Sequence, residues 1–297
     1  MNVEAFEQWR PLMMGLAYRM LGEVHEAEDA VQDAYLRWSQ AEGIEAPAAW
    51  LTKVVTNLCI NRLNSARVRR ESYAGTWLPE PVSTADAAFG PMETAEQRET
   101  VSLALLSLME NLTPAERAVF VLREAFAYPH REIADIIDVT EAASRQLHSR
   151  ARKHLGDASP RFDPDPTDLR KLVERFVAAA SEGDVSGLEA LLAEDVIAWS
   201  DGGGKVTAAR RPILGRNRVA RFVLGVVAQV EAMDLDFEEI NGRPAIVGRL
   251  HGEPAIVAAF EASNGRIQGL WNVLNPDKLQ RLSHPTSPSG HLWREKE

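Results

Sequence analysis

The sequence of 297 residues contains a single cysteine, Cys59, so one chain cannot form a disulfide with itself. A lone cysteine in a helical pattern is more often a small core residue than a nucleophile, and we expect Cys59 to be buried. The seven histidines are scattered singly, without the paired spacing of metal ligands, so neither a metal site nor a cofactor is predicted. No stretch reaches the roughly 20 apolar residues of a membrane span. Glu4, Glu7 and Arg10 interrupt the first apolar residues, which argues against a signal peptide, and we expect a cytosolic protein with no membrane partner.

Positive charge is in deficit, with 33 Lys and Arg against 43 Asp and Glu and a net charge of -10. Attraction to phosphates depends instead on local clusters, because charges are screened beyond about 8 Å in physiological salt. Residues 62–70 hold four arginines and no acid, and residues 145–155 hold four basic residues and no acid. Residues 23–33 hold five acids and neither Lys nor Arg. These segments predict one polyanionic and one polycationic partner.

Apolar periodicity predicts an all-helical first half. The expected helices span residues 6–21, 26–38, 47–70, 95–112 and 114–126. Residues 71–94 contain three prolines and no helical stripe, which predicts a linker. Thr113 is expected to cap the helix that begins at Pro114, where the missing N–H of proline has no cost.

From residue 168 the pattern becomes that of an α+β domain. The expected elements are helices over 167–183, 185–195 and 217–230, a pair of strands around residue 203, and hairpins at Asn241-Gly242, Gly252 and Asn264-Gly265. Asp201 to Lys205, "DGGGK", superficially resembles a phosphate-binding loop. However, Val206 follows the lysine where a Walker loop needs Ser or Thr, and the glycine spacing also differs. We therefore expect a tight turn between the strands "VIAW" and "KVTA", with positive φ at the glycines.

Residues 131–155 have the pattern of a helix-turn-helix. Asp138 and Val139 are expected to form the turn and Thr140 to cap the second helix. The residues expected to be buried are Ile133, Ala134, Ile137, Ala143, Leu147, Ala151 and Leu155.

A different face of the second helix carries donors suited to DNA. We expect base contacts from Arg145, Gln146, Ser149 and Arg150, and phosphate contacts from Arg152, Lys153 and His154. The alternative is a generic helical pair with a solvated basic face.

The first half resembles the extracytoplasmic-function (ECF) sigma factors, which are two-domain bacterial sigma factors. "AEDAVQDAYLRW" resembles their region 2.2, "AWLTKVVTNLCINRL" resembles regions 2.3 and 2.4, and residues 112–155 resemble region 4. The resemblance implies binding to RNA polymerase core, through the β′ coiled coil and β. It also implies that the first domain melts the downstream promoter box and the second holds the upstream box.

The resemblance also implies roles for single residues. Asp29, Gln32 and Asp33, which share a helical face because they are three and four residues apart, match the surface that docks on β′. Asn57, seven residues after Trp50, matches the asparagine that meets the melted strand; the alternative is a helix-stabilising side-chain bond. Further residues assigned to downstream DNA are Asn61, Arg62, Arg67, Arg69 and Arg70. The upstream-box residues of the family match Arg145, Gln146, Ser149 and Arg150, although Ser149 replaces a bulkier residue.

The second half is similar to SnoaL-like domains, whose cone-shaped fold is shared with nuclear transport factor 2 (NTF2) and ketosteroid isomerase. An ECF subgroup with this fused domain carries the three signatures "WLPEP", "DGGGK" and "NPDKL", and all three occur here. The subgroup implies that the fused domain regulates the sigma half in cis. We expect the protein to be monomeric when free. The residues expected to make the regulatory contacts are Trp77, Leu78, Pro79, Glu80, Pro81, Asp201, Gly202, Gly203, Gly204, Lys205, Asn275, Pro276, Asp277, Lys278 and Leu279.

The domains expected from these patterns are sigma region 2 (1–72), a linker (73–94), sigma region 4 (95–157), a short linker (158–167), the SnoaL-like regulatory domain (168–282) and a tail (283–297).

Three alternatives stay open. The second half could be an enzyme with an apolar pocket lined by Trp199, Asp201, Trp271 and Asn272. It could be a sensor in which a small molecule biases the regulatory contact. The first half could be a DNA-binding regulator that never touches polymerase.

Overall fold

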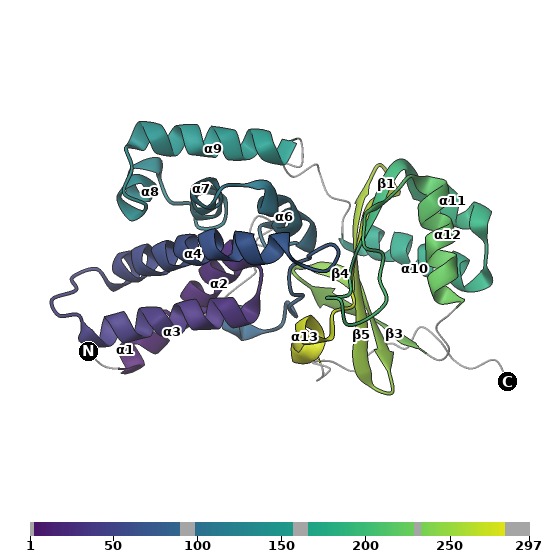
Figure 1. Ribbon diagram of the computed structural model, residues 1–297, viewed down its shortest axis with the longest axis horizontal. Helices are drawn as coiled ribbons and strands as arrows, with labels where there is room; N and C mark the ends of the chain where they lie inside the picture. Colours follow the sequence, from purple (N-terminus) through teal and green to yellow (C-terminus); the bar gives the residue numbers. More distant parts are fainter. Residues whose placement is uncertain (1–2, 90–98, 157–165, 229–232, 283–297) are drawn as a thin grey trace. The chain divides into compact units, whose positions relative to one another are not determined.

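The computed structural model describes residues 3–89, 99–156, 166–228 and 233–282, with the side chains of residues 3, 4, 66–71 and 87 left undescribed. The chain divides into two compact units (Figure 1). The first contains residues 1–72 and 86–159. The second contains residues 73–85 and 160–297, so the segment 73–85 groups with the C-terminal part of the chain.

The first unit is all-α, as its periodicity predicts. Its elements are α1 (Val3–Glu7), α2 (Arg10–Leu21), α3 (Val24–Gln40), α4 (Pro47–Glu71), η1 (Ala87–Phe89), α6 (Leu103–Leu108), η2 (Met109–Asn111), α7 (Pro114–Glu124), α8 (His130–Ile136) and α9 (Glu141–Leu155). Helices α2, α3 and α4 pack together around side chains such as Tyr18, Trp38 and Leu51, all buried. Cys59 is buried in the same bundle, as expected.

Two of the expected helices are interrupted. The helix expected over 6–21 is two helices, because Pro11 has no N–H to continue the first and instead stands at the start of α2. The helix expected over 95–112 is broken at Ser102, whose side chain accepts a hydrogen bond from the Leu105 amide and begins α6. Residues 95–98 of that expected helix lie outside the described residues.

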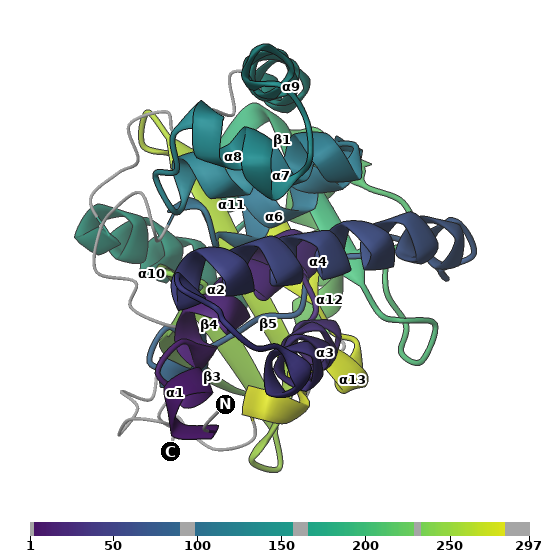
Figure 2. The same cartoon turned by 90° about the vertical axis from the view of Figure 1, so that its left-hand side faces the viewer.

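The cap at Thr113 is confirmed and forms a complete capping box. The Thr113 hydroxyl accepts from the Glu116 amide, and the Glu116 carboxylate accepts from the Thr113 amide at 3.0 Å. This fixes the start of α7, on which α8 and α9 pack. Figure 2 looks nearly along α9 and shows it above α7 and α8.

The second unit is α+β, as predicted. Its elements are α10 (Pro166–Glu182), α11 (Val185–Leu191), β1 (Leu192–Asp201), β2 (Ile213–Leu214), α12 (Arg216–Val227), β3 (Asp234–Ile240), β4 (Arg243–Leu250), β5 (Glu253–Ser263), β6 (Arg266–Val273), α13 (Pro276–Leu279) and η4 (Gln280–Leu282). The strands form one sheet in the order β2-β1-β6-β5-β4-β3, and only the β1–β6 pair is parallel. Helices α10, α11 and α12 cover one face of the sheet (Figure 1).

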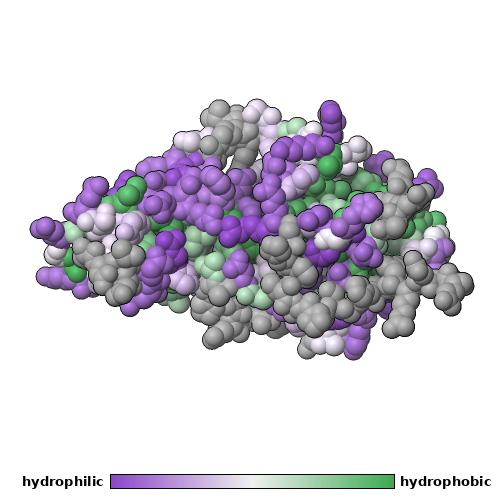
Figure 3. All heavy atoms as spheres, turned by 90° about the horizontal axis from the view of Figure 1, so that it is seen from below, coloured by the Kyte–Doolittle hydropathy of each residue, from purple (hydrophilic) through white to green (hydrophobic). Residues whose placement is uncertain are grey.

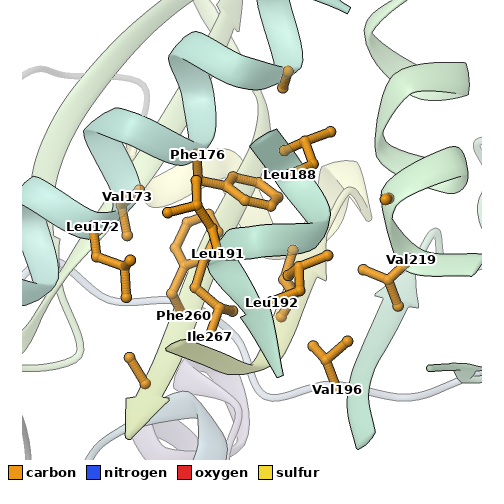
Figure 4. Packing of buried hydrophobic residues seen from close by; sticks show 14 of the residues in the cluster. Leu172, Val173, Phe176, Leu188, Leu191, Leu192, Val196, Val219, Phe260 and Ile267 are labelled. Carbon is orange, nitrogen blue, oxygen red and sulfur yellow. The ribbon is translucent and has the colours of Figure 1, made fainter. Parts of the chain in front are cut away.

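Apolar side chains fill the space between these helices and the sheet (Figure 4). Phe176 of α10 meets Phe260 of β5 edge to face, with 5.6 Å between the ring centroids. Leu188 and Leu191 of α11 and Val219 of α12 extend the cluster. Burial of this apolar surface is the main force that holds the three helices on the sheet.

The hairpin predictions are confirmed at three turns. Asn241, His251 and Asn264 have φ of 52°, 54° and 53°, each followed by a glycine with positive φ. These values match the two-residue turns that suit the twist of antiparallel strands.

The expected strand "KVTA" is wrong. Gly203 and Gly204 do have positive φ, of 62° and 71°. However, the amides of Lys205 and Val206 both donate to the carbonyl of Gly202, so they are committed to a turn and cannot pair with β1. The strand that pairs antiparallel with β1 is instead the two-residue β2, Ile213–Leu214.

Within the described residues no helix is long and apolar enough to cross a bilayer. Hydrophilic residues predominate on the face drawn in Figure 3. Exposed large apolar side chains are few among the described residues. They are Leu36, Val139, Val185, Val206, Leu214, Val227 and Leu250.

Candidate nucleic-acid and regulatory sites

The helix-turn-helix has the geometry that the sequence predicts, but three of the seven residues expected to be buried, Ile137, Ala143 and Leu147, are only half-buried. Thr140 caps α9 by accepting from the Ala143 amide at 3.1 Å, and Asp138 has φ of 55° in the turn. Ile136 is buried, whereas the expected Ile137 is only half-buried. The reason is that α8 ends at Ile136, so Ile137 no longer follows the helical repeat.

The outer face of α9 is open to solvent. All six residues assigned to upstream DNA are exposed: Arg145, Gln146, Ser149, Arg150, Arg152 and Lys153. Arg145 pairs with Glu141 one turn earlier, and the Arg150 Nε lies 3.8 Å from the Glu116 carboxylate. The Arg145 pair is exposed and weak, and the contact of Arg150 with the buried Glu116 is long, so both guanidinium groups can exchange these partners for base edges or phosphates.

The inner face of α9 is held by a polar cluster with α7 and α8. His148 Nε2 lies 2.7 Å from Glu124, and His130 Nδ1 lies 3.0 Å from the Ser144 hydroxyl. The hydrogen bond from His148 holds the pKa of Glu124 below its usual value. Burial, and then the charge of His148, lower the pKa of His130. These contacts orient α9 on its supporting helices.

The acidic surface of α3 is partly engaged within the molecule. Asp29 and Gln32 are exposed and Asp33 is half-buried. Arg62 of α4 donates to Asp33 at 2.6 Å and to Glu26 at 3.2 Å. Arg62, which the sequence assigns to downstream DNA, therefore also neutralises part of the acidic face.

Asn57 is also engaged. Its Nδ2 donates to the carbonyl of Lys53 at 2.9 Å, which is the helix-stabilising bond considered as the alternative, and to the carbonyl of Ile136 on α8 at 3.0 Å. Lys53 Nζ donates to the Asp135 carbonyl at 2.6 Å and to Asp138 Oδ1 at 2.7 Å. The face of α4 that carries Asn57 therefore packs against the first helix of the helix-turn-helix. Asn61 is exposed, and the side chains of Arg67, Arg69 and Arg70 lie outside the described residues.

The three short signatures meet around one carboxylate. Asp201, at the end of β1, is 0% exposed and accepts four hydrogen bonds. Oδ1 accepts from the Tyr73 hydroxyl at 2.7 Å and from the Gly203 amide at 2.9 Å. Oδ2 accepts from the Leu78 amide at 2.9 Å and from Lys278 Nζ at 2.8 Å. All lone-pair directions of the carboxylate are used, as a buried charge requires.

Lys278 completes this centre from α13. Its ammonium also donates to the Leu78 carbonyl and lies 4.4 Å from the centroid of the Trp77 ring and 5.2 Å from that of Tyr73. Cation–π attraction is strongest for such desolvated ammonium groups. Asn275 Nδ2 donates to the Tyr73 hydroxyl at 2.9 Å. We call these residues, Tyr73, Trp77, Leu78, Asp201, Asn275 and Lys278, the Asp201 clamp.

The remaining residues of the signatures lie around the clamp. Pro79, Glu80, Pro81, Gly202 and Leu279 are buried, and Gly204, Lys205, Pro276 and Asp277 are exposed. Lys205 joins "DGGGK" to "NPDKL" through an ion pair of 2.6 Å with Asp277. Gly203 cannot carry a side chain without strain, because an added Cβ would lie 2.4 Å from the Asn275 amide carbon.

A second set of contacts holds residues 82–84 along the end of β3. Asn241 Oδ1 accepts from the Val82 amide at 3.0 Å, and the Asn241 amide donates to the Val82 carbonyl at 2.9 Å. The Thr84 amide donates to the Glu239 carbonyl, and its hydroxyl accepts from the Gly242 amide. We call this the Asn241 clasp. Because β3 is the last strand in the sheet order, the segment occupies otherwise unpaired backbone groups.

The four residues proposed to line an enzymatic pocket contact one another or the Asp201 clamp. Trp199 and Trp271 are neighbours on β1 and β6, stacked with 4.8 Å between centroids. Asn272 Nδ2 donates to the Trp199 carbonyl, and the Asp201 carboxylate is fully hydrogen-bonded within the clamp. No carboxylate is left among these four to abstract a proton from a substrate.

Comparison with known proteins identifies both halves of the first unit. Residues 5–69 match the family model "Sigma-70 region 2", and residues 102–155 match "Sigma-70, region 4". The chain is 38% identical to the ECF RNA polymerase sigma factor SigJ of Mycobacterium tuberculosis, over 98% of this chain and 99% of that protein.

The chain is an ECF RNA polymerase sigma factor.

Two further comparisons cover the second unit of the sigma factor as well. The probable ECF sigma factor SigI of M. tuberculosis is 30% identical over 94% of each chain. The crystal structure of the M. tuberculosis sigma factor SigJ matches with a TM-score of 0.76 at 34% identity, covering 96% of this sigma factor and all of that chain. The fold class, two helical sigma regions followed by an α+β domain, is thereby confirmed.

In this sigma factor several residues of the site were missed from sequence. Tyr73 stands four residues before "WLPEP" and nothing in its surroundings marks it. Asn241 was interpreted only as a turn residue, which it is, but its side chain also holds Val82. The Asn-Gly pair was the one available signal.

Proposed function

We propose that this sigma factor binds RNA polymerase core and directs it to promoters, and that its second unit regulates this activity in cis by holding residues 73–84. The Asp201 clamp is the single observation that carries the proposal. In the clamp, a buried carboxylate of the fused domain accepts a hydrogen bond from the Leu78 amide and pairs with a buried ammonium of the same domain. Leu78 belongs to the segment that joins sigma region 2 to sigma region 4. Through the clamp the fused domain binds this segment specifically.

Holding this segment changes the length of chain available between the two DNA-binding regions. Residues 73–85 would span roughly 40 Å if extended, at about 3.3 Å per residue. While the Asp201 clamp and the Asn241 clasp hold them, that length cannot be used to separate region 2 from region 4. Release of the segment lets the two regions reach promoter boxes that lie further apart. Because the regulator is tethered, it acts at an effective concentration near millimolar.

Within the first unit, we propose that Asp29, Gln32 and Asp33 contact the β′ coiled coil, that Asn57 and Asn61 meet the melted strand, and that α9 contacts the upstream box. The exposed Arg145, Gln146 and Arg150 have the donors for base edges. Asn57 must leave the Ile136 carbonyl before it can bind DNA, so the contact of α4 with α8 opposes promoter binding in the free protein.

We propose a regulatory rather than a catalytic role for the second unit. Enzymes of this fold class use an acid that can exchange protons with a substrate. Asp201 already accepts four hydrogen bonds, and the space between helices and sheet is filled by apolar side chains.

Two experiments test the proposal. In the first, core polymerase is pulled down with the full-length chain and with Asp29→Arg/Asp33→Arg. We expect the double variant to lose binding, and the control Glu42→Arg/Glu45→Arg, with the same change of charge on exposed residues of a loop, to retain it. Gln32→Arg, which breaks none of the ion pairs of Arg62, should weaken binding as well. Retained binding in the double variant contradicts the assigned surface.

The second experiment tests regulation in cis. Run-off transcription is measured with core polymerase and the full-length chain on promoters that this holoenzyme selects from genomic DNA. Asp201→Asn, which weakens the clamp, should change the yield several-fold. Asp195→Asn, an exposed acid on the same strand, should not. Equal yields from the native chain and Asp201→Asn would sink the regulatory role while leaving the sigma activity intact.

A further inference from the structure

The second unit carries a run of arginines that the proposed function does not use. Residues 206–228 contain five arginines and no acid or lysine, in a chain whose net charge is -10. Arg210 and Arg211 stand in the loop before β2, and Arg218 and Arg221 stand on α12, all four exposed. The fifth, Arg216, is half-buried at the start of α12. We call the four exposed residues the arginine surface.

The arginine surface is unusual because no acid in the described part of the chain neutralises its charges. Among the described residues, none of the four forms an ion pair with an acid. On α10 of the same unit, by contrast, Arg170 pairs with Glu174 and Lys171 pairs with Asp168. Four unpaired guanidinium groups on one continuous segment repel one another, and an anion would relieve that repulsion.

Among the described residues, the acids on the neighbouring elements form no ion pair with these arginines. Glu189 of α11 accepts from the Asn217 side chain at 2.7 Å. Glu194 and Asp195 stand at the start of β1, where the Glu194 carbonyl faces Gly215. The helix itself favours an anion, because α12 has twelve residues, is preceded by Gly215 with no side-chain cap and has no acid in its first turn.

The fold presents these arginines outward. Arg218 and Arg221 are three residues apart and share one face of α12, while Val219 and Ala220 are fully buried on the other. Figure 1 shows α12 beside α11 on the helical face of the sheet. Ile213 and Leu214 fix the loop by pairing with β1. The backbone of Arg210 lies beside Gly75 of the segment 73–85, since a Cβ added to Gly75 would be 3.6 Å from the Arg210 Cα.

We propose that the arginine surface binds the phosphate backbone of duplex DNA, as a DNA contact in the second unit additional to sigma regions 2 and 4. Guanidinium groups match phosphate oxygens with two parallel hydrogen bonds, and phosphate contacts carry no base sequence. The surface therefore adds affinity for DNA whatever the promoter. The inference goes beyond regulation in cis, and neither one depends on the other.

The test uses the full-length chain and a fluorescein-labelled 40-base-pair duplex of random sequence. Binding is followed by fluorescence anisotropy between 50 and 200 mM salt. The variant Arg211→Gln/Arg218→Gln/Arg221→Gln is compared with the control Lys171→Gln/Arg175→Gln/Arg266→Gln, which removes three exposed positive charges elsewhere in the same unit. Both variants have the same net charge, so the comparison isolates position.

We expect the first variant to bind at least about tenfold more weakly at 50 mM salt. Its plot of log affinity against log salt should be shallower by about 2 to 3, because each lost phosphate contact removes about 0.9 from the slope. The control should change affinity less than about twofold. Equal losses in both variants would show an effect of net charge alone and would overturn the proposal, as would no loss in either.

Two other outcomes would also overturn it. β2 is the terminal strand and Leu214 is 57% exposed, so the arginines could serve only to keep a second copy from pairing there. In that case the first variant forms dimers in light scattering and keeps its DNA affinity. If an acidic protein surface is the partner, core polymerase binding falls and DNA affinity does not. If the triple variant fails to fold, the salt titration is repeated with the single variants Arg218→Gln and Arg221→Gln, which change exposed residues of a helix. Each should reduce the slope by about 0.9.

Discussion

Lys278 Nζ lies 2.8 Å from Oδ2 of Asp201, and both side chains are almost fully buried. The two residues are 77 positions apart, and the backbone of Leu78 lies between them as a shared partner, donating to the carboxylate and accepting from the ammonium. A buried pair of this kind adds little stability over an apolar pair, but loss of one partner leaves a charge without compensation. It therefore makes the position of Leu78 specific.

The buried pair predicts that mutations of Asp201 and Lys278 have non-additive effects on the free energy of unfolding. Asp201→Asn leaves the Lys278 ammonium buried and uncompensated, and should lower the free energy of unfolding of the second unit by about 3 to 5 kcal/mol. Lys278→Met should have a comparable effect by leaving the carboxylate alone. The double variant should lose much less than the sum of the two, because neither charge remains. Urea denaturation followed by tryptophan fluorescence measures all four proteins; additive losses would mean that the two groups do not interact.

A second prediction separates two costs of replacing a glycine, the strain of a positive φ and the displacement of a residue of the Asp201 clamp. Gly203 and Gly265 both have positive φ, of 62° and 69°, but only at Gly203 would an added Cβ meet a neighbour, the Asn275 side chain. Gly265→Ala should therefore cost only the backbone term of about 1 to 2 kcal/mol. Gly203→Ala should cost more and should also raise the quenching of Trp77 by acrylamide, because Asn275 is displaced from Tyr73. Identical losses of stability in the two variants, with unchanged quenching, would show that the Asn275 side chain moves aside without cost.

Local patterns predicted the elements of this protein well, because caps and hairpins depend on neighbouring residues. Thr113, Thr140 and the Asn241-Gly242 turn all behave as their sequence indicates. The segment 73–85 was interpreted as a linker because its prolines and lack of periodicity give no local signal for packing. Its partners stand more than 100 residues away, as in the bond of Tyr73 to Asp201, and such distant pairs leave no periodic trace.

The contact of α4 with α8 predicts that loss of the Lys53–Asp138 ion pair makes local opening of α8 more frequent. Asp138→Asn keeps a residue that tolerates φ of 55° but removes the ion pair with Lys53. The pair is partly exposed, so hydrogen exchange of the α8 amides should speed up by at most about fivefold, equivalent to 1 kcal/mol. Asp135→Asn, in α8 itself, is the control, since Lys53 binds the carbonyl of that residue and not its carboxylate. Equal exchange rates in the two variants would contradict a role for the ion pair.

The proposed base recognition by α9 predicts two kinds of loss in promoter binding. Arg145→Ala or Arg150→Ala should cost about 1 to 3 kcal/mol in promoter binding and should relax the preference at single base positions. Lys153→Ala should weaken binding to all sequences alike and reduce the salt dependence by about one phosphate contact. In the proposed complex Arg145 would leave Glu141 to bind DNA, but that exposed pair is too weak to mask the effect. Binding to a library of mutated promoters by the holoenzyme measures both, and uniform losses in all three variants would refute base recognition.

The buried thiol of Cys59 predicts how the first unit responds to pH and to thiol reagents. Burial raises the pKa of Cys59 to about 12, so the folded protein holds the thiol proton more tightly than the unfolded chain does. The resulting stabilisation is complete below the pKa of the unfolded thiol, near 8.5, and is lost as the pH rises from there toward 12. At pH 8 a disulfide reagent such as Ellman's reagent should therefore react with Cys59 only as fast as the helical bundle opens. Its rate should rise with urea in parallel with unfolding measured by circular dichroism. Rapid stoichiometric reaction of the native protein would show that α4 exposes this side chain without unfolding.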